Sequence, residues 1–301
     1  DIIPARCSYT QIAATGDWTS PFRPLGEMLS SADITIGTLD STIASRAPFG
    51  CTETLNLAGP PEAIEGLVFA GYDVLSHAAN HIRDCGNVDC GEQTMLDTIA
   101  ALRSRGIQPV GSGPNIAAAR APVVVERNGI YFAFLAYDDI APYYHAGETY
   151  GGAAPMDEAT IAEDVMNAKK VADIVVVIPH WGTEYTADPN ERQRSFARAA
   201  AAAGADLVIG NHPHWVQGYE QIGKTYVAYA LGNFVFDQDW SLETQQGAML
   251  EVTFRGKKVT STKFTPIHIY DQYQPRLAPP EEAAAILDRI EGAAAKLRAT
   301  P

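Results

Sequence analysis

Short runs of β-branched and aromatic residues alternate with longer helical patterns along most of this chain. The expected strands span residues 34–38, 73–76, 131–137, 174–179 and 207–210. The expected helices lie mostly between them, at residues 61–70, 92–105, 157–171 and 190–203. This alternation predicts an α/β layer fold, in which helices cover the faces of a largely parallel sheet.

The pattern changes after Gly218, where strands follow one another closely. We expect strands at residues 225–229, 248–254 and 258–266, and the last two are joined by the short turn Arg255-Gly256-Lys257. Strands joined by such short turns usually pair antiparallel, so we expect them to add antiparallel strands to a sheet. An alanine-rich helix at residues 279–297 begins with two prolines and two glutamates, which suit a first helical turn. The sequence thus predicts one domain at residues 1–270 and a C-terminal helical extension at 271–301 packed on it.

Composition and charge exclude several classes of protein. Of 301 residues 46% are hydrophobic, which is ordinary for a globular chain, and 19% are charged, which is below the usual quarter. Basic minus acidic residues gives 22 − 36 = −14. Duplex binding needs clustered basic residues, so we expect no nucleic-acid partner. Apolar runs such as 174–179 are far shorter than the about twenty residues that cross a bilayer. Because the sequence begins at Asp1 without a methionine, it is compatible with a signal or a membrane anchor preceding that residue.

Polar residues gather directly after four of the expected strands. The segments are Leu39-Asp40-Ser41, Ala79-Asn80-His81 with Asp84, His180-Trp181-Gly182-Thr183-Glu184, and Asn211-His212-Pro213-His214. Ligand sites of α/β folds lie beyond the carboxyl ends of strands, and imidazole, amide and carboxylate groups bind first-row divalent ions. Each segment alone is also typical of a cap or a turn. Together they predict a metal site.

Five fragments of the sequence resemble a known family and occur in that family's order. They are DIIPAR at 1–6, ANHIRDCG at 79–86, HWGTEY at 180–185, GNHPH at 210–214 and LGNFVFD at 231–237. The likeness is to the CapA family of poly-γ-glutamate capsule synthesis proteins, which are similar in turn to the calcineurin-like metallophosphoesterases. It implies a four-layer α/β/β/α metallophosphoesterase-like sandwich with a dinuclear metal site between the sheets. It also implies a role in the synthesis or export of a capsule polymer.

The resemblance assigns roles to individual residues. One metal would be held by Asp1, Asp40 and His214, and the other by Asp40, Asn80, His180 and His212. His81 would be the catalytic proton donor with Asp84 as its orienting partner, and Arg6 and Glu184 are candidates for substrate binding. Two divalent ions at such a site polarise a phosphoryl or carbonyl oxygen and generate hydroxide near neutral pH. Mn, Fe and Zn all accept mixed oxygen and nitrogen ligands.

One departure from the phosphoesterase pattern leaves two hypotheses open. Ile3 stands where those enzymes have a second histidine ligand, and Glu184 either fills the vacant coordination position or is a solvated carboxylate. The first hypothesis is a dinuclear-metal hydrolase that cleaves a phosphoester or a γ-glutamyl amide, which His81 and Asp84 favour. The second is a non-catalytic, metal-containing accessory subunit that binds the acidic polymer or membrane-bound capsule synthesis and export proteins, which Ile3 favours.

Four cysteines lie in polar or glycine-flanked segments. They fit either two disulfides in an exported protein or four reduced thiols, whereas a zinc knuckle would need a second close pair. We predict one disulfide between Cys7 and Cys51, which lie in loops after the first two strands of the implied fold. We predict another between Cys85 and Cys90, which bracket a short glycine-containing loop. The expected location is extracellular or in the cell envelope.

Overall fold

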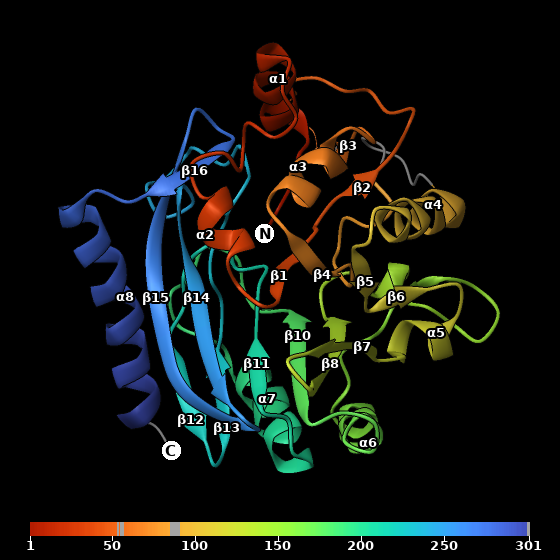
Figure 1. Cartoon of the computed structure of the whole chain (residues 1–301), viewed down its shortest axis with the longest axis vertical. Helices are drawn as coiled ribbons and strands as arrows, with labels where there is room; N and C mark the ends of the chain where they lie inside the picture. Colours follow the sequence, from red (N-terminus) through yellow and green to blue (C-terminus); the bar gives the residue numbers. More distant parts are fainter. Residues whose placement is uncertain (53, 55–56, 85–90, 300–301) are drawn as a thin grey trace.

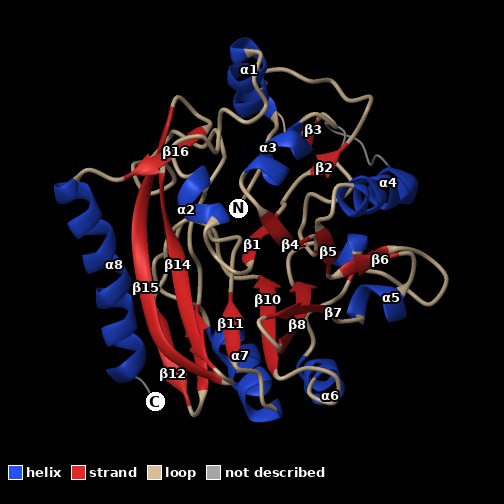
Figure 2. Ribbon diagram, viewed as in Figure 1, coloured by secondary structure: helices blue, strands red, loops and turns tan. Residues whose placement is uncertain are grey.

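Two β-sheets lie face to face in the computed structural model, with helices on both outer sides (Figure 1). The structure describes residues 1–52, 54, 57–84 and 91–299. Figure 2 shows most helices at the periphery and the strands between them. The order of layers is α/β/β/α, so the predicted fold class is confirmed.

The first sheet has six strands in the order β12-β13-β11-β10-β8-β7. Their bounds are β7 Val123–Arg127, β8 Ile130–Asp138, β10 Ile174–His180, β11 Leu207–Ile209, β12 Tyr219–Ile222 and β13 Thr225–Ala228. The four central strands are parallel, whereas β7 and β12 run antiparallel at the edges. Strand β10 is buried along its whole length, as expected where helices or a second sheet cover both faces.

Successive side chains of β10 point to opposite faces of this sheet. Val175 and Val177 pack with the outer helices α6 (Glu158–Ala168) and α7 (Glu191–Ala203). Ile174, Val176 and Ile178 belong instead to the core between the two sheets. Each such side chain stabilises the fold by roughly 1.5–3 kcal/mol relative to an exposed one. Burial on both faces therefore holds β10 in place, and its last residue is His180.

The second sheet consists of two three-stranded pieces, β1-β4-β5 and β14-β15-β16. Their bounds are β1 Thr35–Thr38, β4 Tyr72–Ser76, β5 Gln108–Val110, β14 Gln246–Arg255, β15 Lys258–Tyr270 and β16 Gln274–Leu277. Backbone bridges link Ile2 to both Leu39 and Val235, and Gly232 to Gly247. The first residues of the chain therefore lie in the middle of this sheet, between β1 and the segment that leads into β14.

The remaining elements cover the outer faces or connect strands. They are α1 Arg6–Thr15, α2 Gly26–Ser30, α3 Ala63–Phe69, α4 Gly91–Ser104, α5 Ile116–Arg120, α8 Pro280–Ala299, the 3-10 helix η1 Pro142–Tyr144, and the short strands β2 Thr42–Ile43, β3 Ala58–Gly59, β6 Ser112–Gly113 and β9 Gly152–Ala153. Helix α8 runs along the β14–β15 hairpin (Figure 1), and Ile286 and Ile290 pack there against Ala248. Within the described ranges, no helix combines the length and apolarity needed to span a membrane.

Helix α7 shows how the local sequence sets a helix boundary. The side chain of Asn190 accepts a hydrogen bond from the backbone N–H of Gln193 at 3.0 Å, and the Gln193 side chain accepts one from the backbone N–H of Asn190 at 2.9 Å. This reciprocal capping box fixes the start of the helix. Gly204 ends it with φ 101°, a left-handed conformation that glycine adopts most easily. The local sequence therefore fixes both ends of helix α7.

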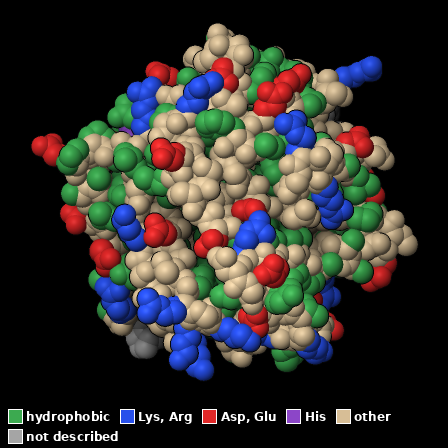
Figure 3. Space-filling model, viewed as in Figure 1, with side chains coloured by type: hydrophobic (Ala, Val, Ile, Leu, Met, Phe, Trp, Pro, Cys, Tyr) green, Lys and Arg blue, Asp and Glu red, His purple; other side chains and the backbone are tan. Residues whose placement is uncertain are grey.

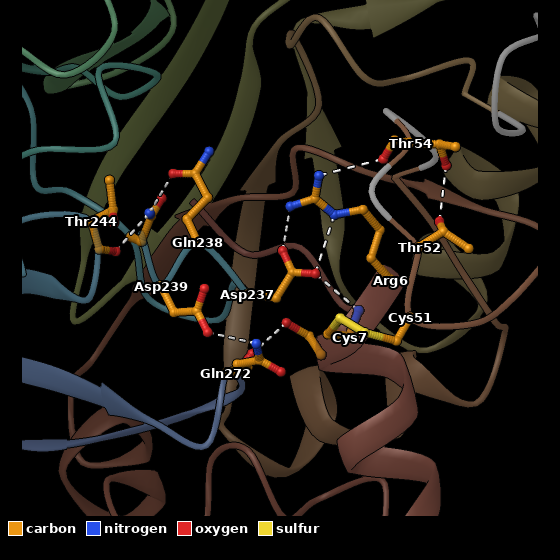
Figure 4. A network of polar contacts seen from close by, with 12 residues as sticks. Arg6, Cys7, Cys51, Thr52, Thr54, Asp237, Gln238, Asp239, Thr244 and Gln272 are labelled. Carbon is orange, nitrogen blue, oxygen red and sulfur yellow. Dashed lines mark hydrogen bonds and ion pairs between the residues drawn. A yellow bond between two sulfur atoms is a disulfide. The ribbon is translucent and has the colours of Figure 1, made fainter. Parts of the chain in front are cut away.

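The disulfide between Cys7 and Cys51 is present and joins the start of α1 to the loop after β2 (Figure 4). The predicted pairing of these two cysteines is thus confirmed. The predicted Cys85–Cys90 bridge lies outside the described residues.

Surface charges are mixed on the face that Figure 3 shows. Acidic and basic side chains lie interspersed there, with apolar groups between them. The chain as a whole carries a formal charge of −14. An anionic partner would therefore meet long-range repulsion and would need local positive charge for binding.

Candidate metal centre

The ends of four strands deliver the candidate ligands to one place. Asp40 follows β1, Asn80 follows β4, His180 is the last residue of β10, and His212 and His214 follow β11. The strands run parallel within each sheet, so their carboxyl ends meet at one edge of that sheet. The structure thus brings together the groups that the sequence pattern placed in one site.

Asp1, Asp40 and His180 form an enclosed group. One ligand atom from each lies within 4.8 Å of the others. His180 Nε2 lies 3.7 Å from Asp40 Oδ2 and 2.6 Å from Asn80 Oδ1. Among the described residues, both carboxylate oxygens of Asp40 and Oδ1 of Asp1 are buried without a hydrogen-bond partner. Buried carboxylate oxygens that lack donors are costly, and a bound cation would remove that cost.

The turn at His212 and His214 is strained. Their φ angles are 94° and 58°, in the left-handed region that residues other than glycine rarely adopt, at a cost of about 1–3 kcal/mol each. Both side chains are buried, and their ring centroids are 5.6 Å apart. The His212 ring also lies 4.8 Å from the His180 ring. This left-handed turn at residues 212–214 therefore aims both imidazoles into one site.

Two asparagines fix the hydrogen-bonding state of the histidines. Asn211 donates its side-chain N–H to the carbonyl of Pro179 at 3.3 Å, which leaves its Oδ1 to accept a hydrogen bond from Nδ1 of His180. Asn233 donates to Gln238 Oε1 and to the carbonyl of Thr244, so its Oδ1 accepts from Nδ1 of His214 at 2.9 Å. Each imidazole is then neutral with its lone pair on Nε2, the form in which histidine binds metals. In this form Nε2 of His180 and Oδ1 of Asn80, 2.6 Å apart, are both acceptors, and a bound cation would relieve their repulsion.

Burial shapes the protonation of the site. Desolvation lowers the pKa of His180 well below its ordinary value, and the neighbouring His212 lowers it further. Desolvation also lowers the pKa of His212, with His214 adding to the shift. The pKa of Asp40 is raised by burial, although His81 and His214 oppose that rise. Neutral imidazoles beside a carboxylate whose charge burial disfavours are the arrangement that a divalent cation relieves.

These residues fit a centre with more than one metal. The donor atoms form two groups, Asp1 with Asp40 and His180, and Glu184 with His212 and His214. Asp1 lies next to both, because its Oδ2 is 3.4 Å from Nδ1 of His214. The family resemblance implies a different division, with His214 beside Asp1 and Asp40 and with His212 beside His180. The chemistry of the donors is mixed oxygen and nitrogen, which suits Mn, Fe or Zn.

His81 and Asp84 form a pair next to the candidate ligand Asn80. Nδ1 of His81 is hydrogen bonded to Oδ2 of Asp84. Burial lowers the pKa of His81, but the charges of Asp40 and Asp84 outweigh that effect, and the net shift is upward. The side chain of His81 is 14% exposed, so part of it reaches solvent. The geometry is that of a proton donor whose orientation a carboxylate fixes.

Arg6 lies near the site but is already engaged (Figure 4). Its guanidinium makes a two-point contact with the carboxylate of Asp237 and lies 5.1 Å from the ring centroid of Phe236. Asp237 also accepts from the backbone N–H of Cys7 at 2.9 Å, which ties α1 to this segment. The predicted anion-binding role of Arg6 would therefore have to operate beside a neutralising carboxylate.

Glu184 lies at the rim of the site and is more open. Its side chain is 44% exposed, and Oε1 lies 3.9 Å from Nε2 of His214. Sequence reasoning missed Asn233 and Asp237 as supporting residues, although both lie in the fragment LGNFVFD at 231–237 that contributed to the family resemblance. Their position in that fragment was the available signal.

Comparison with protein families matches most of this chain. The model of a family described as bacterial capsule synthesis protein PGA_cap covers residues 1–238. The chain belongs to the PGA_cap family. The residues of the candidate metal centre and the His81–Asp84 pair all lie inside the matched range of this PGA_cap chain.

Individual relatives agree with the family assignment. The PGA biosynthesis protein CapA of Bacillus subtilis (strain 168) is 31% identical over 255 residues, which are 84% of this chain and 66% of that protein. The capsule biosynthesis protein CapA of Bacillus anthracis is 31% identical over 224 residues, 73% of this chain and 53% of that protein. This PGA_cap chain therefore spans somewhat more than half of the length of the CapA proteins it matches.

A solved structure shares the fold at low sequence identity. A hypothetical protein from Thermus thermophilus superposes with a TM-score of 0.51 and 13% identity, covering 84% of this chain and 94% of that one. The likeness shows that the α/β arrangement of the PGA_cap chain recurs in a protein of very different sequence.

Proposed function

We propose that this PGA_cap chain is a metal-dependent hydrolase of the cell envelope that acts in the synthesis or export of poly-γ-glutamate capsule. The observation that carries the proposal is the convergence, beside the His81–Asp84 pair, of buried ligand atoms of Asp1, Asp40 and His212 that have no hydrogen-bond partner within the described part of the chain. Family membership and the names of the two CapA relatives support the capsule role. The Cys7–Cys51 disulfide supports a location in an oxidising compartment outside the cytosol.

The protein's own groups divide the work of hydrolysis. Two divalent ions, when bound, supply a Lewis acid and a hydroxide nucleophile at neutral pH. Asp1, Asp40, Asn80, His180, His212 and His214 would hold them. Oδ2 of Asp84 accepts the hydrogen bond from Nδ1 of His81 and so leaves Nε2 to deliver a proton to the leaving group. The upward shift of the His81 pKa keeps that proton available nearer to neutral pH.

One observation favours the second candidate function, a non-catalytic accessory subunit. Ile3 is fully buried in an apolar cluster with Ala5, Leu57 and Phe236, so the position where the phosphoesterases have a histidine offers only hydrocarbon here. A centre with one ligand fewer would then hold metal in a structural role. In that case the chain would bind the acidic polymer or the membrane-bound synthesis proteins without cleaving a bond.

Metal analysis and turnover separate the two candidates. Chelator-treated protein is reloaded with Mn²⁺, Fe²⁺ or Zn²⁺, and metal content is measured by elemental analysis. The double variant His212→Ala/His214→Ala should lose most of the metal, whereas His268→Ala should retain it, because His268 lies on β15 and pairs with Glu282. Equal metal content in the double variant and the wild type would overturn the proposed centre.

Turnover is then measured on aryl phosphoesters and on poly-γ-glutamate. His81→Ala should keep its metal and lose roughly 10²–10⁴-fold in turnover, as expected for a lost general acid, with a smaller loss on substrates that have good leaving groups. Asn80→Ala should instead weaken metal binding, because a ligand oxygen disappears. Metal loss in His81→Ala would identify His81 as a ligand. A fully loaded wild type that cleaves neither substrate class would favour the accessory function.

A further inference from the structure

Three potential ligands meet at the outer side of the centre. Glu184, His212 and His214 each offer one donor atom, and these atoms lie within 4.8 Å of one another. His212 and His214 are buried, whereas Glu184 reaches in from the exposed rim. Two imidazoles and one carboxylate are a common ligand set for a divalent metal with open coordination positions.

The lone pairs of this group point to a cation. Because Asn233 accepts the hydrogen bond from Nδ1 of His214, the lone pair of that ring is on Nε2, 3.9 Å from Oε1 of Glu184. Nδ1 of His212 is buried and has no hydrogen-bond partner among the described residues. A buried polar atom without a partner costs about 1–3 kcal/mol. Nε2 of His214 and Oε1 of Glu184 are both acceptors and repel one another, and a shared cation turns that repulsion into attraction. A cation at Nδ1 of His212 would also supply that atom with a partner.

The backbone holds Glu184 beside the histidine turn. Tyr185, the next residue, donates its backbone N–H to the carbonyl of Pro213 at 2.9 Å. The Tyr185 ring also stacks on His214, with centroids 6.0 Å apart and planes 28° apart. Gly182 supplies the left-handed conformation, φ 96°, that turns the chain after β10. Little reorganisation is therefore needed to bring the Glu184 carboxylate to a metal at His214.

We infer that Glu184 is a metal ligand and completes a second metal centre with His212 and His214, in place of the ligand that Ile3 does not supply. Ile3 cannot coordinate, and its surroundings are apolar. Glu184 lies in the loop after β10, and its carboxylate oxygen replaces the histidine nitrogen that is missing at Ile3. The inference rests on the proposed metal centre and replaces the substrate-binding role expected for Glu184 from the sequence.

The test is a titration of chelator-treated protein with Co²⁺, followed by absorption spectroscopy and calorimetry. Wild type should bind two equivalents. Glu184→Gln, which keeps the size of the side chain, should bind one equivalent with unchanged affinity and the second at least tenfold more weakly. The d–d absorption of the second Co²⁺ should also change, because a neutral amide replaces the charged carboxylate. Glu148→Gln is the matched control, since Glu148 is an exposed glutamate outside both donor groups.

The possible results separate the two proposals. Two equivalents at wild-type affinity in Glu184→Gln would overturn the role of Glu184 and leave the hydrolase proposal intact. A single equivalent in wild type would also overturn the second centre. Absence of any Co²⁺ binding in wild type would instead overturn the proposed function and, with it, the role of Glu184. Glu184 is partly exposed, so its substitution leaves the packed core unchanged, and circular dichroism checks that the variant is folded.

Discussion

Asn233 determines which nitrogen of His214 is free to bind a metal. Oδ1 of Asn233 lies 2.9 Å from Nδ1 of His214, and its amide group donates to Gln238 Oε1 at 3.1 Å and to the carbonyl of Thr244 at 2.9 Å. Those two donations prevent the amide from flipping, because the reversed orientation would lose both. The lone pair of His214 is thereby directed toward the site by a residue that acts through His214 and not as a ligand itself.

Replacing Asn233 with alanine should weaken metal binding without removing a ligand. Loss of a residue that orients a metal-bound histidine typically reduces affinity 10–100-fold. We expect a reduction of this size in Co²⁺ affinity at one of two sites, measured by calorimetry. Asn167→Ala is the control, because Asn167 pairs with Lys170 on the surface near the end of α6. Unchanged affinity in Asn233→Ala would show that His214 does not depend on this hydrogen bond.

The Cys7–Cys51 disulfide should contribute measurably to stability. It closes a loop with a sequence separation of 44 residues, and closing a loop of that length in the unfolded chain corresponds to about 4 kcal/mol. We therefore expect Cys7→Ala/Cys51→Ala to lower the free energy of unfolding by about 2–4 kcal/mol, measured by urea denaturation. A double variant as stable as wild type would mean that the disulfide does not constrain the unfolded chain.

The central strands and the long helices were predictable because their patterns are local. Strand β10 is apolar from Ile174 to Ile178, and β8 and β11 read the same way, so the predicted bounds lie within a few residues of those observed. Helix α7 has a capping asparagine before it and a glycine after it. Helix α1 was missed, because its sequence is largely polar and only Ser8 and Ile12 are buried. The edge strand β12 was missed for the same reason, since none of its residues is fully buried.

The sequence predicted which residues lie together at the candidate site, but not how their donor atoms are grouped. Asp40, His180 and His212 follow apolar strands, and that position is visible in the sequence. The division of donors into two groups depends on the left-handed turn at His212 and His214, which no local pattern specifies. The supporting role of Asn233 follows from no local pattern either, because it depends on a hydrogen bond to a residue 19 positions away, and only its place in the fragment at 231–237 pointed to it.

Buried His77 should make stability depend on pH. Burial lowers its pKa from 6.5 to about 4, and a hydrogen bond with the backbone of Ser41 only partly opposes this. Between pH 6.5 and 4 the unfolded chain therefore binds more protons than the folded one, and stability falls as pH falls. Between about pH 7 and pH 4, the free energy of unfolding of His77→Gln should fall by about 3 kcal/mol less than that of wild type. If the free energies of unfolding of the two proteins, measured by urea denaturation, fell equally over this pH range, His77 would not be the source of the pH dependence.

The segment that carries His212 and His214 should not tolerate a side chain at Gly210. A Cβ there would lie 2.1 Å from Nε1 of Trp181 and 2.2 Å from the carbonyl oxygen of Tyr229. Trp181 is fully buried and already donates to that carbonyl at 2.8 Å, so neither group can move without losing this bond. We expect Gly210→Ala to destabilise the protein by about 1–3 kcal/mol, as overpacking does. It should also weaken Co²⁺ binding, because residues 211–214 must shift.

Gly292→Ala is the matched control for this substitution. A Cβ at Gly292 meets nothing within 4 Å, and the residue lies inside helix α8. Alanine there should raise the free energy of unfolding by about 0.4–1 kcal/mol, because it restricts the unfolded chain, and Co²⁺ binding should stay at the wild-type level. Both variants are measured by urea denaturation and calorimetric titration. If Gly210→Ala bound Co²⁺ as tightly as Gly292→Ala, the position of the histidine turn would not depend on its close packing against Trp181.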